Sequence, residues 1–196
     1  MSSSARIRKA VIPAAGLGTR HFPGSHAVMK ELFPVVGQDG ICRALLHYHL
    51  IELANAGIDE VCIIVQPGDD ITIRDSFKGP ERHLPQSASK NLPKLLDQAR
   101  LMKAWAEHLT FRVQTTQEGF GHAAFQTADF AAGEPVFLCL GDHLFRGSPE
   151  SPHAQLTRVA AETGAKKTSP PSTASPPTSS KATGPSQAAV ARIGQS

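Results

Sequence analysis

The amino-acid sequence predicts an α/β fold with a mostly parallel sheet. Residues 9–15 predict a buried first strand, because most of them are small or branched apolar residues that run into a glycine. Residues 41–56 predict a helix, with leucines at helical spacing and Gly57 as its stop. The apolar run 60–66, EVCIIVQ, is typical of a strand buried on both faces. A strand, a helix and a second strand in this order indicate a βαβ unit, whose strands are parallel.

The rest of the chain continues this alternation of helices and strands. An apolar stripe predicts a helix over 92–109, and alternating apolar residues predict a strand over 109–115. The stretch before that helix is loop-like, because it contains Gly79-Pro80 and Leu84-Pro85. Three further elements are expected, in the order helix 121–130, buried strand 135–140 and helix 155–163.

The composition is that of one core-forming domain without a nucleic-acid-binding face. The 196 residues are 40% hydrophobic and 19% charged, which is enough apolar material for a single core. The formal net charge is +3, but residues 164–196 hold four basic residues and no acidic one. The remainder carries 16 basic residues against 17 acidic ones. We therefore expect no nucleic acid as a partner of the folded part.

The cysteines and the apolar runs predict the cellular compartment in which the protein resides. Cys42, Cys62 and Cys139 are far apart, and each lies in an apolar run, which predicts buried free thiols in a reducing environment. No run of 18 apolar residues occurs, so no membrane partner is expected. No signal-peptide-like apolar region precedes the first strand. These observations predict a cytoplasmic protein.

His47 and His49 lie together in the helix predicted at 41–56. Paired histidines can bind a metal ion, but residues two apart point to different faces of a helix. Packing and solvent roles are therefore favoured for both.

The chain changes character after residue 163. From Gly164 onward Pro, Ser, Thr, Ala and Lys dominate, and the few aliphatic residues cluster at 188–193. Such a segment cannot bury enough apolar surface to offset the entropy of ordering it. We therefore expect a folded but incomplete domain at 1–163 and a disordered tail at 164–196. Either a low-complexity regulatory tail or a reading-frame change in a truncated gene model explains this boundary.

The candidate site begins where the first strand ends. The segment 9–34, KAVIPAAGLGTRHFPGSHAVMKELFP, runs from the strand through a glycine-rich loop to Arg20 and then Lys30. Gly16 and Gly18 let backbone N–H groups approach phosphate oxygens. Arg20 can bind phosphate with two N–H groups, and Lys30 supplies a mobile point charge. This order suits a site that cleaves a nucleoside triphosphate between its α- and β-phosphates, and an ordinary glycine-rich turn is the alternative.

Two other nucleotide motifs are excluded. The dinucleotide fingerprint needs a third glycine, and His21 stands at that position. The Walker A loop needs Gly-Lys-Ser/Thr, which does not occur in the sequence.

The motif PAAGLGTR…KELFP resembles the signature of the sugar-phosphate nucleotidyltransferases, and most closely that of the bacterial-type UTP–glucose-1-phosphate uridylyltransferases. The resemblance implies a Rossmann-like nucleotidyltransferase sheet, mixed but mostly parallel, here truncated on its C-terminal side. It also implies the reaction of UTP with glucose 1-phosphate to give UDP-glucose and pyrophosphate. UTP and glucose 1-phosphate are thus the expected partners, and a homo-oligomer stays open.

The resemblance also implies roles for residues of this motif. Arg20 would hold the β- and γ-phosphates of the leaving pyrophosphate, and Lys30 would contact the α-phosphate, so these two are the expected catalytic residues. The backbone of the loop would face the base and the ribose. The expected nucleotide-binding residues of this segment are Ala14, Ala15, Gly16, Gly18, Thr19 and Glu31.

Two later segments complete the expected site. The stretch QTTQEGFGHA resembles the base-reading loop of the family, with Gln114 as the uracil reader and Gly119 as a point of close backbone approach. Asp142 follows a buried strand and matches the family's first metal-binding aspartate, which implies Mg²⁺ as cofactor. The alternatives are a surface glutamine before a turn and an aspartate that caps a turn. No role is assigned to His143.

The resemblance covers roughly residues 8–163, and it has departures. His26 stands where the family has Lys, and Met29 where it has Pro. The family's second metal-binding aspartate and its sugar-phosphate Glu and Lys have no counterpart in residues 164–196. We therefore expect this chain to be weakly active or inactive. The alternatives are a nucleotide-binding pseudoenzyme that regulates a complete homologue, a non-functional gene fragment, and a related enzyme that uses dTTP or GTP.

Overall fold

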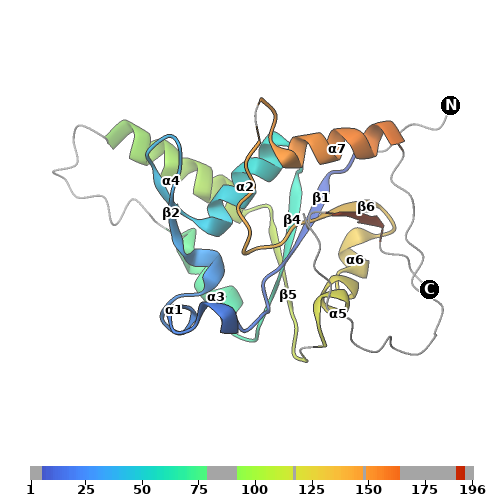
Figure 1. The fold of residues 1–196 in the computed structure, drawn as a ribbon, viewed down its shortest axis with the longest axis horizontal. Helices are drawn as coiled ribbons and strands as arrows, with labels where there is room; N and C mark the ends of the chain where they lie inside the picture. The colour runs from blue at the N-terminus through green and yellow to red at the C-terminus, as the bar shows by residue number, and fades with distance from the viewer. Residues whose placement is uncertain (1–5, 79–91, 117, 148, 164–188, 193–196) are drawn as a thin grey trace.

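The computed structural model describes residues 6–78, 92–116, 118–147, 149–163 and 189–192, and its centre is a five-stranded sheet (Figure 1). The strand order is β5-β4-β1-β6-β7, and neighbours are parallel except β6 and β7, which are antiparallel. The fold class predicted from the sequence, α/β with a mixed but mostly parallel sheet, is therefore confirmed. The strands are β1 (Lys9–Pro13), β4 (Glu60–Val65), β5 (Leu109–Val113), β6 (Pro135–Leu138) and β7 (Ala189–Arg192).

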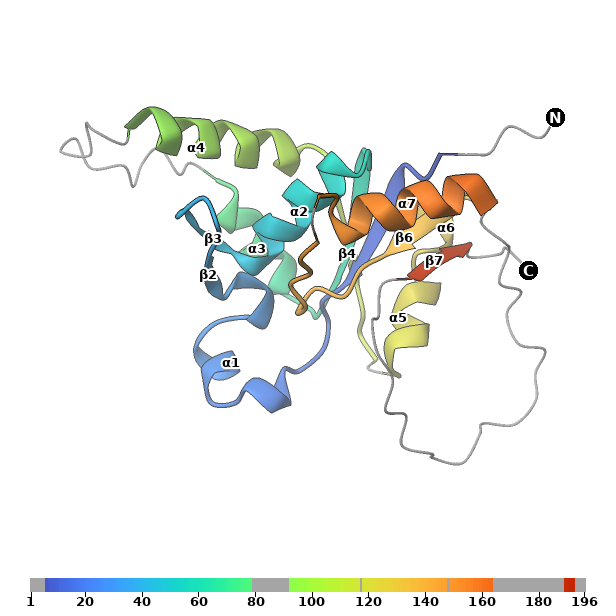
Figure 2. The same ribbon diagram turned by 45° about the horizontal axis from the view of Figure 1, so that its top comes forward.

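Helices cover both faces of this sheet, which explains why its strands are apolar throughout (Figure 2). Successive residues of β1 separate into two hydrophobic clusters, with Ala10 and Ile12 in one and Val11 in the other. The first cluster is covered by α2 (Leu45–Asn55), α3 (Asp69–Ser76), α4 (Leu92–Ala106) and α7 (Pro152–Thr163). The second is covered by α5 (Phe120–Phe125) and α6 (Ala128–Ala131). No helix in the described ranges has both the length and the apolarity needed to cross a bilayer.

A small hairpin precedes α2, and it corrects the helix predicted at 41–56. Strand β2 (Pro34–Val36) pairs antiparallel with β3 (Cys42–Ala44), so the helix begins only at Leu45. The pairing with β2 holds these three residues in an extended backbone, despite the helical pattern of their side chains. Cys42 is exposed on this hairpin, which corrects the prediction of a buried thiol, whereas Cys62 and Cys139 are buried as predicted.

Other boundaries differ from the prediction for local reasons. The helix predicted at 121–130 divides into α5 and α6, because Thr127 turns its hydroxyl to the carbonyl of Ala124 at 2.7 Å and becomes the N-cap of α6. Helix α7 begins at Pro152, three residues earlier than predicted. Ser151 precedes it, and its Oγ accepts a hydrogen bond from the N–H of Ala154 at 3.2 Å. Helix α3 lies ahead of α4 where the sequence indicated no helix.

Strand β7 corrects one part of the disorder predicted at 164–196. Its four residues pair with β6 in the register Pro135↔Arg192 to Leu138↔Ala189. They belong to the aliphatic cluster at 188–193. They pair with the edge of β6 that β1 does not occupy, so β7 completes the hydrogen bonding of β6. The rest of the predicted tail, 164–188 and 193–196, lies outside the described residues. The division of the chain at residue 163 stays a prediction.

The packing of α2 against the sheet gives a first prediction. Leu53 is 0% exposed in the larger cluster, so Leu53→Ala is expected to lower the free energy of unfolding by about 2–5 kcal/mol. The same truncation at Leu144, which is 45% exposed, should change it by less than about 1 kcal/mol. Urea unfolding of both variants measures the difference. Equal losses at the two positions would contradict this account of the core.

Candidate nucleotide-binding site

The candidate site lies at the carboxyl end of the parallel strands, where β1 is flanked by β4 and β6. The order along the chain reverses at β1, because β4 and β5 extend the sheet on one side and β6 extends it on the other. Loops that follow strands on the two sides of such a point diverge and leave a crevice between them. The segments after β1 and β6 therefore meet at the edge where α/β sheets bind ligands.

The loop after β1 is tight, and its conformation requires a glycine. Ala14 and Ala15 are buried, and the N–H of Ala14 donates to the carbonyl of Ile64 at 2.7 Å, which extends the strand pairing. Gly18 has φ +62°, and a Cβ there would lie 3.0 Å from the Cβ of Ser25. Ser25 also donates its hydroxyl to the carbonyl of Gly18 at 2.8 Å. A side chain at position 18 would therefore be strained, and the loop needs glycine.

Arg20 follows in a single 3-10 turn, η1 (Thr19–His21). Thr19 and Arg20 are both exposed, and in the described part of the chain the Arg20 guanidinium has no ion-pair partner. Arg20, which is predicted to bind phosphate, is thus accessible to an anion from solution.

Lys30 and Asp142 form the centre of the site. They are 112 positions apart in the sequence, yet Lys30 Nζ lies 3.0 Å from Asp142 Oδ2. The same ammonium lies 3.4 Å from Glu31 Oε1, and a Cβ on Gly16 would be 3.4 Å from it. The structure therefore brings together the predicted catalytic lysine, the predicted metal ligand and the glycine loop.

Asp142 is held as a carboxylate by its neighbours. Partial burial by itself would raise the pKa of this carboxyl, but the hydrogen bonds and charges of Lys30 and His143 outweigh it and lower the pKa below its usual range. His143 Nδ1 lies 2.7 Å from Asp142 Oδ1. His143 thus orients the carboxylate, a role that its position next to Asp142 could have indicated.

Glu31 lies beneath Lys30 and is only 1% exposed. A Cβ on Gly141 would lie 3.2 Å from Glu31 Cγ and 3.1 Å from Ile12, so the carboxyl is enclosed between the ends of β1 and β6. Burial raises the pKa of Glu31 to about 7, against the opposing charge of Lys30. A carboxyl in this position lies against Lys30 and is buried, and its predicted contact with the nucleotide stays a prediction.

Gln114 comes directly after β5 and is buried, which excludes the alternative of a surface glutamine. Its N–H continues the strand pairing by donating to Val65, and its Nε2 lies 3.2 Å from His122 Nδ1. His122 also lies 3.4 Å from the Nε2 of Gln126. The imidazole of His122 thus orients the amide of Gln114. This role of His122 was not predicted from the sequence.

Gly119 starts helix α5 with φ +95°, a backbone conformation that other residues rarely adopt. Nothing lies within 4 Å of the place where its Cβ would be. The backbone there is open to an approaching group. Within the described residues, no hydrogen bond or ion pair joins Arg20 or Gln114 to the group around Lys30.

The two departures from the family signature have different structural consequences. Met29 has φ −54°, inside the range of proline, and its side chain packs against the larger core cluster. The backbone that proline would fix is therefore reached without it. His26 lies exposed in α1 (Gly24–Ala27), where its ring is 6.5 Å from that of Phe22.

Asp142 fits Mg²⁺ as a single protein carboxylate. Mg²⁺ prefers one or two carboxylates together with phosphate oxygens and water. The side chain of Asp142 is 24% exposed at the crevice, whereas the carboxyl of Glu31 is enclosed beneath Lys30. The described residues therefore supply one reachable carboxylate, and the phosphates of a nucleotide would complete the coordination.

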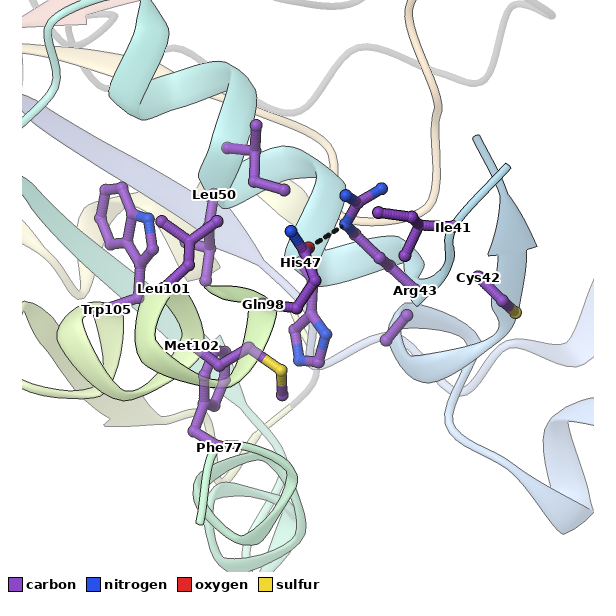
Figure 3. A pocket seen from close by; sticks show the side chains of 12 residues that line it. Ile41, Cys42, Arg43, His47, Leu50, Phe77, Gln98, Leu101, Met102 and Trp105 are labelled. Atoms are coloured by element: carbon purple, nitrogen blue, oxygen red, sulfur yellow. Dashed lines mark hydrogen bonds between the residues drawn. The ribbon is translucent and has the colours of Figure 1, made fainter. Parts of the chain in front are cut away.

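A second hollow, between α2 and α4, does not suit phosphate (Figure 3). This cavity of about 260 Å³ is lined mainly by apolar side chains and by no carboxylate. Its one cation, Arg43, donates to Gln98 Oε1 at 2.6 Å and is paired with Asp39 at 2.7 Å. The charged groups of the chain that suit a nucleotide thus lie at the sheet edge and not in this cavity.

The burial of Glu31 gives a prediction on pH. Between pH 4.5 and about 7 the folded chain keeps a proton on Glu31 that the unfolded chain has lost, so the free energy of unfolding falls as pH rises. Glu31→Gln cannot ionise. Its free energy of unfolding should match that of the wild type below about pH 4 and exceed it by about 3 kcal/mol above about pH 8. Urea unfolding over this pH range measures the difference, with exposed Glu107→Gln as control, and a pH-independent difference would contradict the prediction.

Comparisons with known proteins show the family of this chain. The family described as Nucleotidyl transferase matches residues 9–179, which runs beyond residue 163, where the resemblance was expected to stop. UTP–glucose-1-phosphate uridylyltransferase 2 of Staphylococcus saprophyticus is 33% identical over 159 residues, covering 81% of this chain and 52% of that protein. The UTP–glucose-1-phosphate uridylyltransferase of Streptococcus pneumoniae is 34% identical over 144 residues, covering 72% and 44%.

Solved structures show the same fold. The apo form of a UDP-glucose pyrophosphorylase superposes with a TM-score of 0.65 at 23% identity, over 80% of this chain and 55% of that one. The UTP-bound enzyme from Acinetobacter baumannii gives 0.65 at 24% identity, over 82% and 55%. The chain spans about half the length of the curated relatives that it matches. Because the family match covers most of its residues, the chain belongs to the nucleotidyl transferase family.

Proposed function

We propose that this chain binds UTP together with Mg²⁺ and forms the nucleotide side of a UTP–glucose-1-phosphate uridylyltransferase site. The observation that carries the proposal is the 3.0 Å contact of Lys30 with Asp142 beside the glycine loop. A lysine ammonium and a partly exposed carboxylate at the switch point of a parallel sheet match the needs of a metal-bound triphosphate. The relatives' names point to UTP and glucose 1-phosphate.

In the reaction, an oxygen of glucose 1-phosphate attacks the α-phosphorus of UTP and pyrophosphate leaves. Transfer of this kind needs alignment and charge neutralisation more than covalent work from the protein. Lys30 moves from Asp142 to the α-phosphate, and Asp142 is the residue that would hold Mg²⁺. When bound, Mg²⁺ neutralises phosphate charge. Arg20, exposed on η1, holds the departing β- and γ-phosphates.

The backbone of the glycine loop and Gln114 select the nucleotide. Ala14, Ala15 and Gly16 present a backbone without large side chains to the ribose and base. The amide of Gln114 offers donors and an acceptor that suit a uracil edge, and His122 limits the orientations that this amide can take. Glu31 acts from beneath as a positioning residue for Lys30.

Turnover by this chain is proposed to be slow or absent. The chain spans about half the length of its curated relatives, and the sugar-phosphate residues that the resemblance implies have no counterpart in it. The nucleotide side of the site is present among the described residues. We therefore separate UTP binding, which the chain should perform, from UDP-glucose formation, which should be weak; robust formation by the purified chain would overturn this part.

Isothermal titration of UTP with Mg²⁺ into the purified chain tests the site. Arg20→Ala should weaken UTP binding by about ten- to a hundredfold, because it removes charge-assisted hydrogen bonds to phosphate. Arg100→Ala is the matched control, since Arg100 is exposed on α4 and its one ion pair among the described residues is with Asp97. Binding of UTP that ignores Arg20, or no heat from a folded chain, would reject the proposed site.

A second titration tests the base reader. Gln114→Leu keeps a buried side chain of similar size but removes the amide, so UTP binding should weaken by about tenfold or more. Binding of inorganic tripolyphosphate with Mg²⁺ should not change, because this anion has no base. An equal loss for both ligands would mean that Gln114 acts on the fold and not on uracil. Exposed Gln38→Leu serves as the control.

A further inference from the structure

A cluster of three potential metal ligands lies in the core, apart from the nucleotide site. His49 comes from α2, Cys139 follows β6 directly, and His153 comes from the first turn of α7. Cys139 Sγ lies 3.5 Å from His49 Nδ1 and 3.6 Å from His153 Nε2. The three ligand atoms all lie within 4.8 Å of one another.

These distances match the edges of a metal coordination tetrahedron. With Zn–S of about 2.3 Å and Zn–N of about 2.0–2.1 Å, a tetrahedral angle puts sulfur about 3.6 Å from each nitrogen. Both measured S···N distances agree with this value. The two nitrogens bound to such an ion would lie about 3.3 Å apart. In the structure they lie within 4.8 Å of each other.

The two imidazoles are deeply buried and incompletely bonded. His49 is 1% exposed and His153 is 2% exposed, and Cys139 is fully buried. His49 Nε2 and His153 Nδ1 have no hydrogen-bond partner in the described structure. The single thiol proton can be donated to only one of the two rings. The protein therefore buries polar atoms at a cost that their mutual contacts do not offset.

The protonation of the rings and the surroundings of the cluster favour a bound cation. Burial lowers the pKa of His49 to about 4 and also lowers that of His153, so both rings are neutral at pH 7, the form that binds metals. Phe137 stacks on His153 with ring centroids 5.4 Å apart, and Phe145 approaches edge-on at 5.6 Å. These rings shield the cluster from water.

We propose that His49, Cys139 and His153 bind one borderline-soft divalent cation, Zn²⁺ foremost. Sulfur with two imidazoles is a donor set that suits Zn²⁺ and not the hard Mg²⁺. Burial raises the pKa of the Cys139 thiol to about 12, so its proton leaves only because the metal takes its place: the proton goes to solvent and a metal–thiolate bond forms. The ion would tie α2 and α7 to the end of β6, three residues before Asp142, and so brace the segment that carries the nucleotide site.

Co²⁺ is the probe for this site, because a bound thiolate gives it a charge-transfer band in the near ultraviolet. Titration of the metal-free 196-residue chain with Co²⁺ should produce this band, and Zn²⁺ should abolish it. Cys139→Ser should lose the charge-transfer band. Cys62→Ser, at a thiol buried on the other face of the sheet, and Cys42→Ser, at an exposed thiol, should keep it.

Thermal unfolding tests the proposed metal site independently of the cysteine variants. Excess Zn²⁺ should raise the melting temperature of the EDTA-treated wild type by roughly 5–10 °C, and His153→Gln should lose this gain. The proposal is overturned if the wild type shows no charge-transfer band. It is also overturned if Cys42→Ser or Cys62→Ser loses the band and Cys139→Ser keeps it, or if His153→Gln retains the gain in melting temperature with Zn²⁺. None of these readouts depends on UTP binding, so the proposed function can fail without it.

Discussion

The contact of Lys30 with Asp142 is the interaction on which the site depends. It joins the segment after the glycine loop to the end of β6, two parts of the chain that meet only because β1 and β6 are neighbours in the sheet. The ammonium lies 3.4 Å from the buried carboxyl of Glu31 and beside the glycine loop, so it is held close to the backbone that the nucleotide would approach. A nucleotide phosphate must therefore compete with Asp142 for this cation. Part of the binding free energy is spent on separating the pair, and the gain is a lysine already close to where charge develops.

Glu31 makes this competition sensitive to protons. The charge of Lys30 opposes the effect of burial on the pKa of Glu31. When Lys30 turns toward a phosphate, Glu31 loses part of that counter-charge and holds its proton more firmly. If the chain binds a nucleotide as proposed, nucleotide binding and proton uptake by Glu31 would favour each other, as linkage requires. A permanently ionised carboxylate beneath the lysine would instead repel the incoming phosphates, so burial of this side chain keeps the site from opposing its own ligand.

The sequence predicts the sheet well, because its strands are buried on both faces and read as apolar runs. It fails where structure comes from pairing between distant segments. Residues 42–44 have helical periodicity, yet β2 holds them extended. Residues 189–192 sit in a polar, low-complexity context, and only the free edge of β6 makes them a strand. The closeness of Lys30, the glycine loop and Asp142 agrees with the sequence analysis, where a long motif contains the first two and Asp142 follows a buried strand. The burial of Glu31 could not be predicted, since it depends on Gly141, which lies against Glu31 in the turn that follows β6.

His49 illustrates the same limit most clearly. Sequence periodicity separates it correctly from His47, because the two side chains leave α2 in different directions. Periodicity does not show which residues of other elements these two side chains contact. His47 packs its ring against Phe77, with centroids 4.8 Å apart, whereas His49 faces Cys139 and His153, which are 90 and 104 positions further along the chain. A pair of histidines two residues apart is weak evidence for a metal site, and here that pair is not the relevant one. The relevant ligands become neighbours only after β6 has joined the sheet and α7 has packed on α2, so their chemistry is a product of the fold and not of any local sequence pattern.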